Sequence, residues 1–195
     1  MALDATRLDS APDETLLILF ARGDREAARV LTGRLAPLCF RLALRLLHDR
    51  AEAEDVAQEA MLRLWKTAAD WRNGEARVTT WLYRVVSNLA TDRLRRRRAL
   101  PLDAAPEPVY AAPAVGEAMD AAARAALLQA ALDRLPARQR QAVVLRHLEG
   151  LSNPEIAAVM DVGVEAVESL VARGKRGLVA ALAGQRAEMG YGDDD

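Results

Sequence analysis

The sequence predicts an all-α protein made of two small helical domains. Aromatic residues make up only 4% of the chain, although hydrophobic residues make up 51%. The apolar content is mainly Ala, Leu and Val, without the glycine-rich turn punctuation that accompanies sheets. These apolar residues also recur with the spacing of helix faces.

Composition also bounds the environment of the protein. Cys39 is the only cysteine, so the chain can form no intrachain disulfide and no cysteine-based zinc motif. The N-terminal segment contains acidic residues and no apolar stretch like that of a signal peptide. No apolar run in the chain approaches the roughly 20 residues that a membrane helix needs. We therefore expect a cytoplasmic protein without membrane insertion.

The first three helices are predicted from apolar periodicity between residues 14 and 68. Gly23 and Asp24 separate the first two, Asp24 is a candidate N-cap, and Pro37 is expected to kink or split the second. The third begins at residue 49. Apolar residues between positions 51 and 71 fall on one helical face: Val56, Ala57, Ala60, Met61, Leu64, Trp65 and Ala68. Its early acids either complement the helix dipole or form a docking face for a basic partner.

A polar loop over residues 72–80 precedes the next helix, which is predicted to start at Trp81 with Thr79 or Thr80 as its cap. The apolar stripe contains Leu82, Val85, Val86 and Leu89, and leaves Tyr83, Arg84, Ser87, Asn88 and Asp92 near the other sides. Six arginines (84, 93 and 95–98) stand against Asp92 as the one acid between Trp81 and Arg98. Together with Trp71, this pattern indicates nucleic-acid contact, or otherwise a solvated basic helix end.

Residues 99–119 are predicted to be an acidic, flexible linker. Four of the eight prolines lie here, and four acids and no bases lie between Asp103 and Asp120. The linker separates a domain over residues 1–98 from one over residues 120–184. Residues 185–195 lack periodicity and are expected to form a disordered tail.

The second domain has the layout of a helix-turn-helix. A helix starts at Leu135–Pro136 and ends at Gly150, and residues 152–155 (SNPE) form a capping box. A short helix to Met160 is followed by a turn in which Asp161 tolerates positive φ, and a longer helix runs from about residue 164 to 182. The residues expected to pack the last two helices are Ile156, Ala157, Val162, Val167 and Leu170. The alternative is an ordinary helical hairpin.

No enzyme constellation is present in the sequence. His48, His147 and Cys39 have no metal-ligand spacing, and the chain has no glycine-rich phosphate loop or GxSxG elbow. We expect no catalytic residue, no metal and no cofactor.

These segments together resemble the extracytoplasmic-function (group IV) sigma factors of the sigma-70 family. The resemblance covers residues 14–98 and 120–182. Region 2.2 of the family resembles AEDVAQEAMLRLWK, regions 2.3 to 2.4 resemble WLYRVVSNLATDRLRRRR, and region 4 resembles the stretch from LDRLPARQRQ to GKRGL. The resemblance implies a fold with a region 2 helical bundle and a region 4 helix-turn-helix. It also implies that the protein binds core RNA polymerase, recognises −10 and −35 promoter elements and assists promoter opening.

The resemblance also assigns site residues. The clamp of the largest catalytic polymerase subunit would contact Asp55, Gln58, Glu59 and Leu62. The −10 DNA would contact Trp71, Trp81, Tyr83, Arg84, Asn88, Arg93, Arg95, Arg96, Arg97 and Arg98, with Asn88 beside a flipped base. The −35 DNA would contact Glu165, Glu168, Ser169, Arg173, Lys175 and Arg176.

The recognition helix departs from the family pattern at two positions. Glu168 and Leu170 stand where Lys and Arg are common, so two DNA contacts would be missing. Glu168 could accept a hydrogen bond from a cytosine amino group instead, which predicts an altered −35 sequence.

The implied partners are core RNA polymerase, promoter DNA and an anti-sigma factor, and the free protein is expected to be a monomer. Two other function classes remain open at this point. A sigma-like decoy would bind an anti-sigma factor but would not need Asn88 or the arginines. A helix-turn-helix repressor would not need the acidic helix over residues 49–66.

Overall fold

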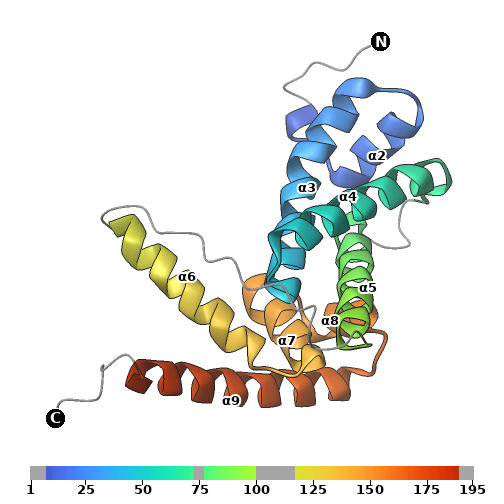
Figure 1. Cartoon of the computed structure of the whole chain (residues 1–195). Helices are drawn as coiled ribbons and strands as arrows, with labels where there is room; N and C mark the ends of the chain where they lie inside the picture. The colour runs from blue at the N-terminus through green and yellow to red at the C-terminus, as the bar shows by residue number, and fades with distance from the viewer. Residues whose placement is uncertain (1–7, 73–76, 100–116, 189–195) are drawn as a thin grey trace. The chain divides into compact units, whose positions relative to one another are not determined.

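The computed structural model describes residues 8–72, 77–99 and 117–188. Every regular element in these ranges is helical, and the chain divides into two compact units, residues 1–96 and 97–195 (Figure 1). The predicted all-α fold with two helical domains is therefore confirmed. None of the described helices is long and apolar enough to cross a bilayer.

The predicted linker and tail lie largely outside the described residues. Residues 100–116 and 189–195 lie outside the described ranges. Residues 117–119 and 185–188, expected to be linker and tail, instead belong to α6 (Glu117–Asp133) and α9 (Val164–Glu188). Glu, Ala, Gln and Arg have high helix propensity, so these helices extend beyond the bounds that we set from apolar periodicity.

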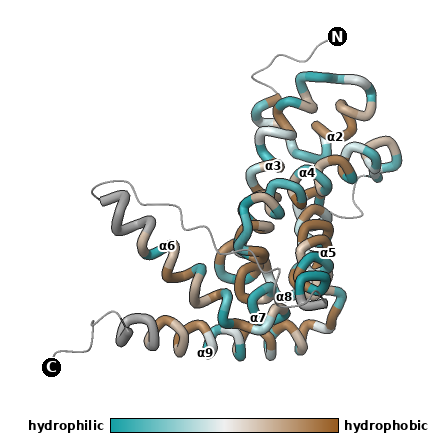
Figure 2. The backbone as a smooth tube through the Cα atoms, in the orientation of Figure 1, coloured by the Kyte–Doolittle hydropathy of each residue, from teal (hydrophilic) through white to brown (hydrophobic). Residues whose placement is uncertain are grey.

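The first unit contains α2 (Asp13–Ala21), α3 (Arg25–Leu47), α4 (Arg50–Thr67), the 3₁₀ turn η1 (Ala68–Asp70) and α5 (Val78–Ala99). Asp24 caps α3 as predicted, because its carboxylate accepts from the backbone N–H groups of Glu26 and Ala27 at 3.0 Å. Fully buried core side chains come from all four α-helices: Leu16 and Leu17, Leu31, Leu35 and Leu42, Val56 and Leu64, and Leu82 and Val86. Figure 2 shows that α5 changes from hydrophobic in its first turns to hydrophilic in its last.

Pro37 does not split α3, which runs without a break through that position. An interior proline removes one backbone hydrogen bond and costs about 3 kcal/mol or more. This cost is offset by burial of the neighbouring side chains, at about 1.5–3 kcal/mol for each large one. These are Leu35 and Cys39 on either side of Pro37, and Leu31 and Leu42 one turn further away. Tertiary packing therefore overrides the local signal.

The start of α5 also differs from the prediction. The helix begins at Val78, so Thr79 and Thr80 lie inside it. The backbone N–H of Val78 donates to Glu14 Oε1 of α2 at 3.0 Å. We expected a neighbouring threonine to cap this helix. Instead, a side chain far away in the sequence accepts the hydrogen bond from the backbone N–H at the first residue of α5.

Cys39 is fully buried in α3, and desolvation raises the pKa of its thiol to about 12. At pH 9 an exposed cysteine is mostly thiolate, whereas folded Cys39 is neutral. We expect no reaction with a thiol reagent in the native protein and full reaction in denaturant. Because the unfolded chain loses this proton more easily, the free energy of unfolding should fall as the pH rises above about 8.5. A Cys39→Ala variant, which lacks the thiol, should not show this component of the pH dependence.

The second unit contains α6, α7 (Ala137–Val143), a π-helical segment η3 (Val144–Leu148), α8 (Asn153–Met160) and α9. Two turn predictions are confirmed: Ser152 and Glu155 form a reciprocal capping box, and Asp161 ends α8 with φ 52°. The predicted helix over residues 136–150 is shorter and changes to π geometry at Val144, before Gly150 adopts φ 75°. Helix α8 packs against α9. Of the five residues expected to pack these helices together, Ile156, Ala157 and Val167 are buried, and Val162 and Leu170 are half-buried.

Gly174 lets α9 approach α7 closely. A Cβ atom there would lie 2.5 Å from Val143 Cγ2 and 3.0 Å from the Gln139 carbonyl oxygen. Overpacking of this kind costs about 1–3 kcal/mol, more than the helix-propensity gain of about 1 kcal/mol. Gly174→Ala should therefore accelerate hydrogen exchange of α7 and α9 amides.

The matched control is Gly33→Ala in α3, because a Cβ at Gly33 meets no atom within 4 Å. This variant should stabilise the first unit by about 0.5–1 kcal/mol. Equal effects of the two substitutions on their own units would contradict the close contact at Gly174.

Candidate nucleic-acid and partner interfaces

A groove of about 480 Å³ lies between α4 and α5 in the first unit. It is lined by Asp55, Gln58, Glu59, Leu62, Arg63, Leu89, Asp92, Arg93 and Arg96. All four residues that the sequence assigned to polymerase binding line this groove, together with two of the arginines assigned to DNA. The structure therefore brings parts of both predicted sites to one surface.

The acids on this face have arginine partners. Arg63 Nε donates to Glu59 Oε1 at 2.8 Å, and Arg93 Nη1 lies 3.5 Å from Asp55 Oδ2. The hydrogen bond from Arg63 lowers the pKa of Glu59, with smaller contributions from the charges of Arg63, Lys66 and Arg93. Glu59 is therefore ionised at neutral pH, and the face is less negative than the residues of α4 alone indicate.

Leu62 gives the groove an apolar element. Its side chain is 46% exposed, which makes it one of the exposed large hydrophobic residues of the described chain. Gln58 beside it is also exposed and belongs to a second groove on the other side of α4. An exposed leucine and an amide between flanking ion pairs are typical of a surface that binds another protein.

The second groove, about 490 Å³ between α3 and α4, was missed in the sequence. It is lined by Ala36, Pro37, Phe40, Arg50, Glu54, Ala57, Gln58 and Met61. The Arg50 guanidinium lies 5.7 Å from the centre of the Phe40 ring and also pairs with Glu54 at 2.9 Å. Pro37 and Phe40 are the sequence signal, because the proline marks an irregular helix surface and the aromatic ring follows it by three positions.

On α5, Asn88 and Arg84 are exposed, as the helix periodicity predicted. Trp81 is half-buried and packs edge-on against Trp71, with ring centroids 6.1 Å apart. The Trp71 indole N–H is buried and meets no hydrogen-bond acceptor among the described residues. Trp81, Arg84 and Asn88 therefore remain accessible on α5 at least in part, and Trp71 supports Trp81.

The expected exposure of Tyr83 and Ser87 is wrong. Tyr83 is 8% exposed and Ser87 is fully buried. Both lie beside the fully buried positions Leu82 and Val86, so the inward stripe of α5 is wider than the four residues predicted from spacing. Tyr83 offers little ring surface on which a base could stack.

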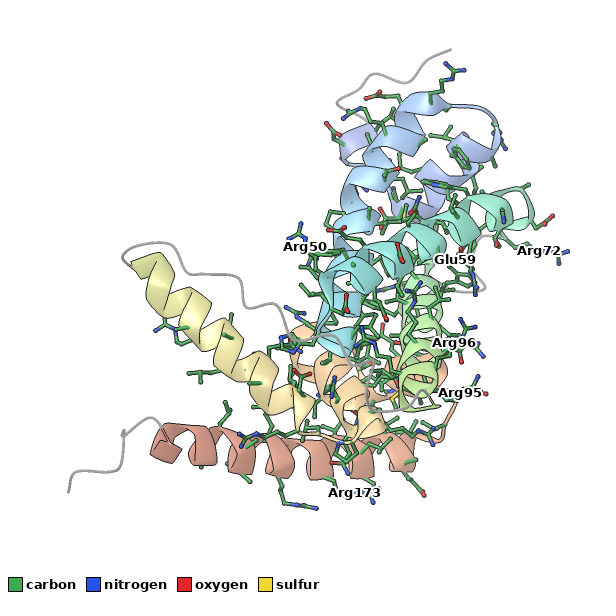
Figure 3. The ribbon with its side chains drawn as sticks, viewed as in Figure 1. Arg50, Glu59, Arg72, Arg95, Arg96 and Arg173 are labelled. Atoms are coloured by element: carbon green, nitrogen blue, oxygen red, sulfur yellow. The ribbon has the colours of Figure 1, made fainter. Side chains whose placement is uncertain are left out.

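The arginines at the end of α5 have different surroundings. Arg93 is partly buried against Asp55, whereas Arg95 is exposed and pairs with Asp92 at 3.2 Å. Arg96 is exposed and lines the α4–α5 groove; Figure 3 shows Arg95 and Arg96 on the last turns of the helix. Arg97 is half-buried, and the Arg98 side chain lies outside the described residues.

In the second unit, all six predicted −35 residues are exposed on the first half of α9: Glu165, Glu168, Ser169, Arg173, Lys175 and Arg176. Arg173, labelled in Figure 3, donates from Nε to the Ser169 carbonyl oxygen at 3.2 Å. Within the ranges that the structure describes, no three histidine, cysteine or carboxylate side chains converge to hold a metal ion.

The family models that match the chain are those of sigma-70 region 2, over residues 31–100, and sigma-70 region 4, over residues 125–178. The RNA polymerase sigma-H factor of Pseudomonas aeruginosa is 31% identical over 186 residues, which cover 90% of this chain and 96% of that protein. The ECF RNA polymerase sigma factor SigM of Mycobacterium tuberculosis is 36% identical over 170 residues, covering 87% and 84%.

A longer relative and a solved structure agree with this. The ECF RNA polymerase sigma factor SigE of Mycolicibacterium smegmatis is 37% identical over 76% of this chain, which spans 59% of the length of SigE. The structure of CnrH in complex with the cytosolic domain of CnrY superposes with a TM-score of 0.66 at 26% identity, covering 88% of this chain and 97% of CnrH.

Proposed function

The chain belongs to the sigma-70 family as an ECF RNA polymerase sigma factor, and from this premise we propose that it directs core polymerase to −10/−35 promoters and assists their opening. The observation that carries the proposal is the placement of exposed Asn88 and Arg84 on α5 and of exposed Arg173, Lys175 and Arg176 on α9. Each unit thus offers DNA-binding side chains. The protein acts as an initiation factor and performs no catalysis of its own.

Polymerase binding is assigned to the α4 face of Asp55, Gln58, Glu59 and Leu62. Since the acids already pair with Arg93 and Arg63, a basic partner would exchange these ion pairs. Such exposed pairs contribute little each, about 0–1 kcal/mol. Burial of Leu62 would therefore supply much of the affinity, and the clamp of the largest catalytic subunit is the surface we assign to it.

Leu62→Glu is accordingly expected to weaken core polymerase binding about tenfold or more, because the partner would lose the burial of a leucine and meet a new charge. Affinity can be measured by fluorescence anisotropy with labelled protein and core enzyme. Val179→Glu is the control, since Val179 is 60% exposed and lies on the second unit. A loss no larger than that of the control would remove Leu62 from the interface.

DNA contacts divide by chemistry. Asn88 would hold a base flipped from the −10 element, because an exposed amide can donate and accept on a base edge. The arginines of α5 would hold phosphates without reading sequence. On α9, Arg173, Lys175 and Arg176 would serve as donors, and Glu168 could select a cytosine.

We also assign an anti-sigma factor as the regulator, in a cytoplasmic protein that is monomeric when free. The support is the likeness to CnrH, which was solved with the cytosolic domain of CnrY. A linker, proposed for residues 100–116 between α5 and α6, would let the two units close around such a partner. Residues 1–98 and 120–184 are the proposed −10 and −35 domains.

The deciding experiment is transcription with purified protein and core polymerase on genomic templates. We expect discrete run-off products whose start sites share −10 and −35 sequences. A decoy would form no productive holoenzyme, and a repressor would bind duplex DNA without core. Failure to form holoenzyme in a pull-down would falsify the sigma-factor assignment.

A further inference from the structure

The start of α5 depends on a residue of another helix. The first turn of α5 contains no acid of its own, although the helix N-terminus carries unpaired N–H groups and a partial positive charge. Glu14 Oε1 accepts the Val78 N–H at 3.0 Å, 64 residues away in sequence. Val78 is fully buried, so water cannot readily replace this acceptor.

Glu14 is itself held in place. It lies in the first turn of α2, whose start is fixed by Arg34 of α3. Arg34 Nη1 donates to Asp13 Oδ1 at 2.9 Å and to the Ala11 carbonyl oxygen at 2.7 Å. The adjacent Leu16 and Leu17 are fully buried, which locks α2 in the core.

Helix α2 supports both sides of the connection that leads to α5. It packs against η1, which ends just before Trp71, and through Glu14 it binds the first residue of α5. The Trp71–Trp81 ring contact joins the same two sides. A shift of the α5 start would therefore move Trp81 and, further along the same rigid helix, Asn88.

We propose that Glu14 is a positioning residue for −10 recognition, fixing the start of α5 so that Trp81 and Asn88 meet the opened strand in register. This rests on the proposed sigma-factor function. Glu14 touches no DNA; it acts through the Val78 N–H. Functional side chains need to be held within about 0.5 Å by such supporting contacts, which is why one hydrogen bond at a helix start matters for a base pocket.

Three substitutions separate the hydrogen bond from the charge. Glu14→Ala removes the acceptor, Glu14→Asp keeps the charge but withdraws the carboxylate by one methylene, and Glu14→Gln keeps an oxygen acceptor at the same reach. We expect the Glu14→Ala and Glu14→Asp variants to lower promoter opening about two- to thirtyfold, which corresponds to the free energy lost when a helix cap is removed. The Glu14→Gln variant should stay within about twofold of wild type. Opening is measured by 2-aminopurine fluorescence in the −10 element, and core affinity should change less than about twofold in all three.

Glu26 provides the matched control, because it is a glutamate in the first turn of α3 that pairs only locally with Arg29 at 2.6 Å among its described contacts. Glu26→Ala should leave opening unchanged. Wild-type opening by the Ala variant, or equal losses in Ala and Gln, would overturn the positioning role. So would a parallel loss of core affinity.

Amide exchange in the free protein tests the contact apart from transcription. Exchange at Val78 should accelerate by a similar factor in the Ala and Asp variants and remain slow in Gln. If the wild-type protein opens no promoter, the proposed function fails, and the exchange result alone decides whether Glu14 positions α5. If opening occurs and exchange is unchanged in all variants, only the inference fails.

Discussion

Replacing Asn88 by alanine is expected to lower promoter opening by about tenfold or more while core polymerase binding stays within about twofold. Flipping a base costs a few kcal/mol, and loss of a hydrogen-bonding partner in a closed site costs about 1–3 kcal/mol. Asn88 is exposed on α5, whereas the face of Leu62 and Gln58 that we propose for core binding lies on α4. The two activities should therefore respond separately.

Opening is measured by permanganate reactivity of −10 thymines, and core affinity by anisotropy. Thr91→Ala is the control, because Thr91 is exposed on the same helix one turn away. A defect that is equal in opening and in core binding would show that Asn88 supports the fold or the polymerase interface instead. Normal opening would remove it from the base pocket.

The features that the sequence predicted correctly depend on interactions between residues close together in the chain. The exposed and buried faces of α4, the Asp24 and Ser152 caps and the positive φ of Asp161 all depend on residues within one or two turns. Periodicity and capping chemistry describe such features directly. The accessibility of Asn88 followed from the same reasoning.

The features that were missed depend on contacts between distant segments. Tyr83 and Ser87 are buried, so the inward face of α5 covers a wider arc than its apolar residues indicate. Glu14 reaches Val78 across 64 residues, and Arg93 reaches Asp55 from another helix. No local pattern encodes such pairs. The basic cluster therefore appeared uniform in the sequence, although its members differ in burial and pairing.

That difference makes the arginines separable. Replacing Arg95 and Arg96 by glutamine should lower holoenzyme affinity for promoter DNA about 25- to 60-fold near 0.1 M salt, if each contacts one phosphate. The slope of log affinity against log salt concentration should become shallower by about 1.4–1.8, the lower value for single-stranded contacts. Both side chains are exposed, so the fold should tolerate the change.

Asp92 allows a change in the opposite direction. Its carboxylate lies 3.2 Å from Arg95, so Asp92→Asn should release that arginine for phosphate and raise DNA affinity.

The control for the Arg95/Arg96 variant is Arg25→Gln with Arg29→Gln, which also removes two positive charges, at exposed positions near the start of α3. An unchanged salt slope in the Arg95/Arg96 variant would mean that the cluster only complements the C-terminal end of the helix dipole. A slope reduced as much by the α3 control would indicate a general effect of net charge, because only a local contact depends on which arginines are removed.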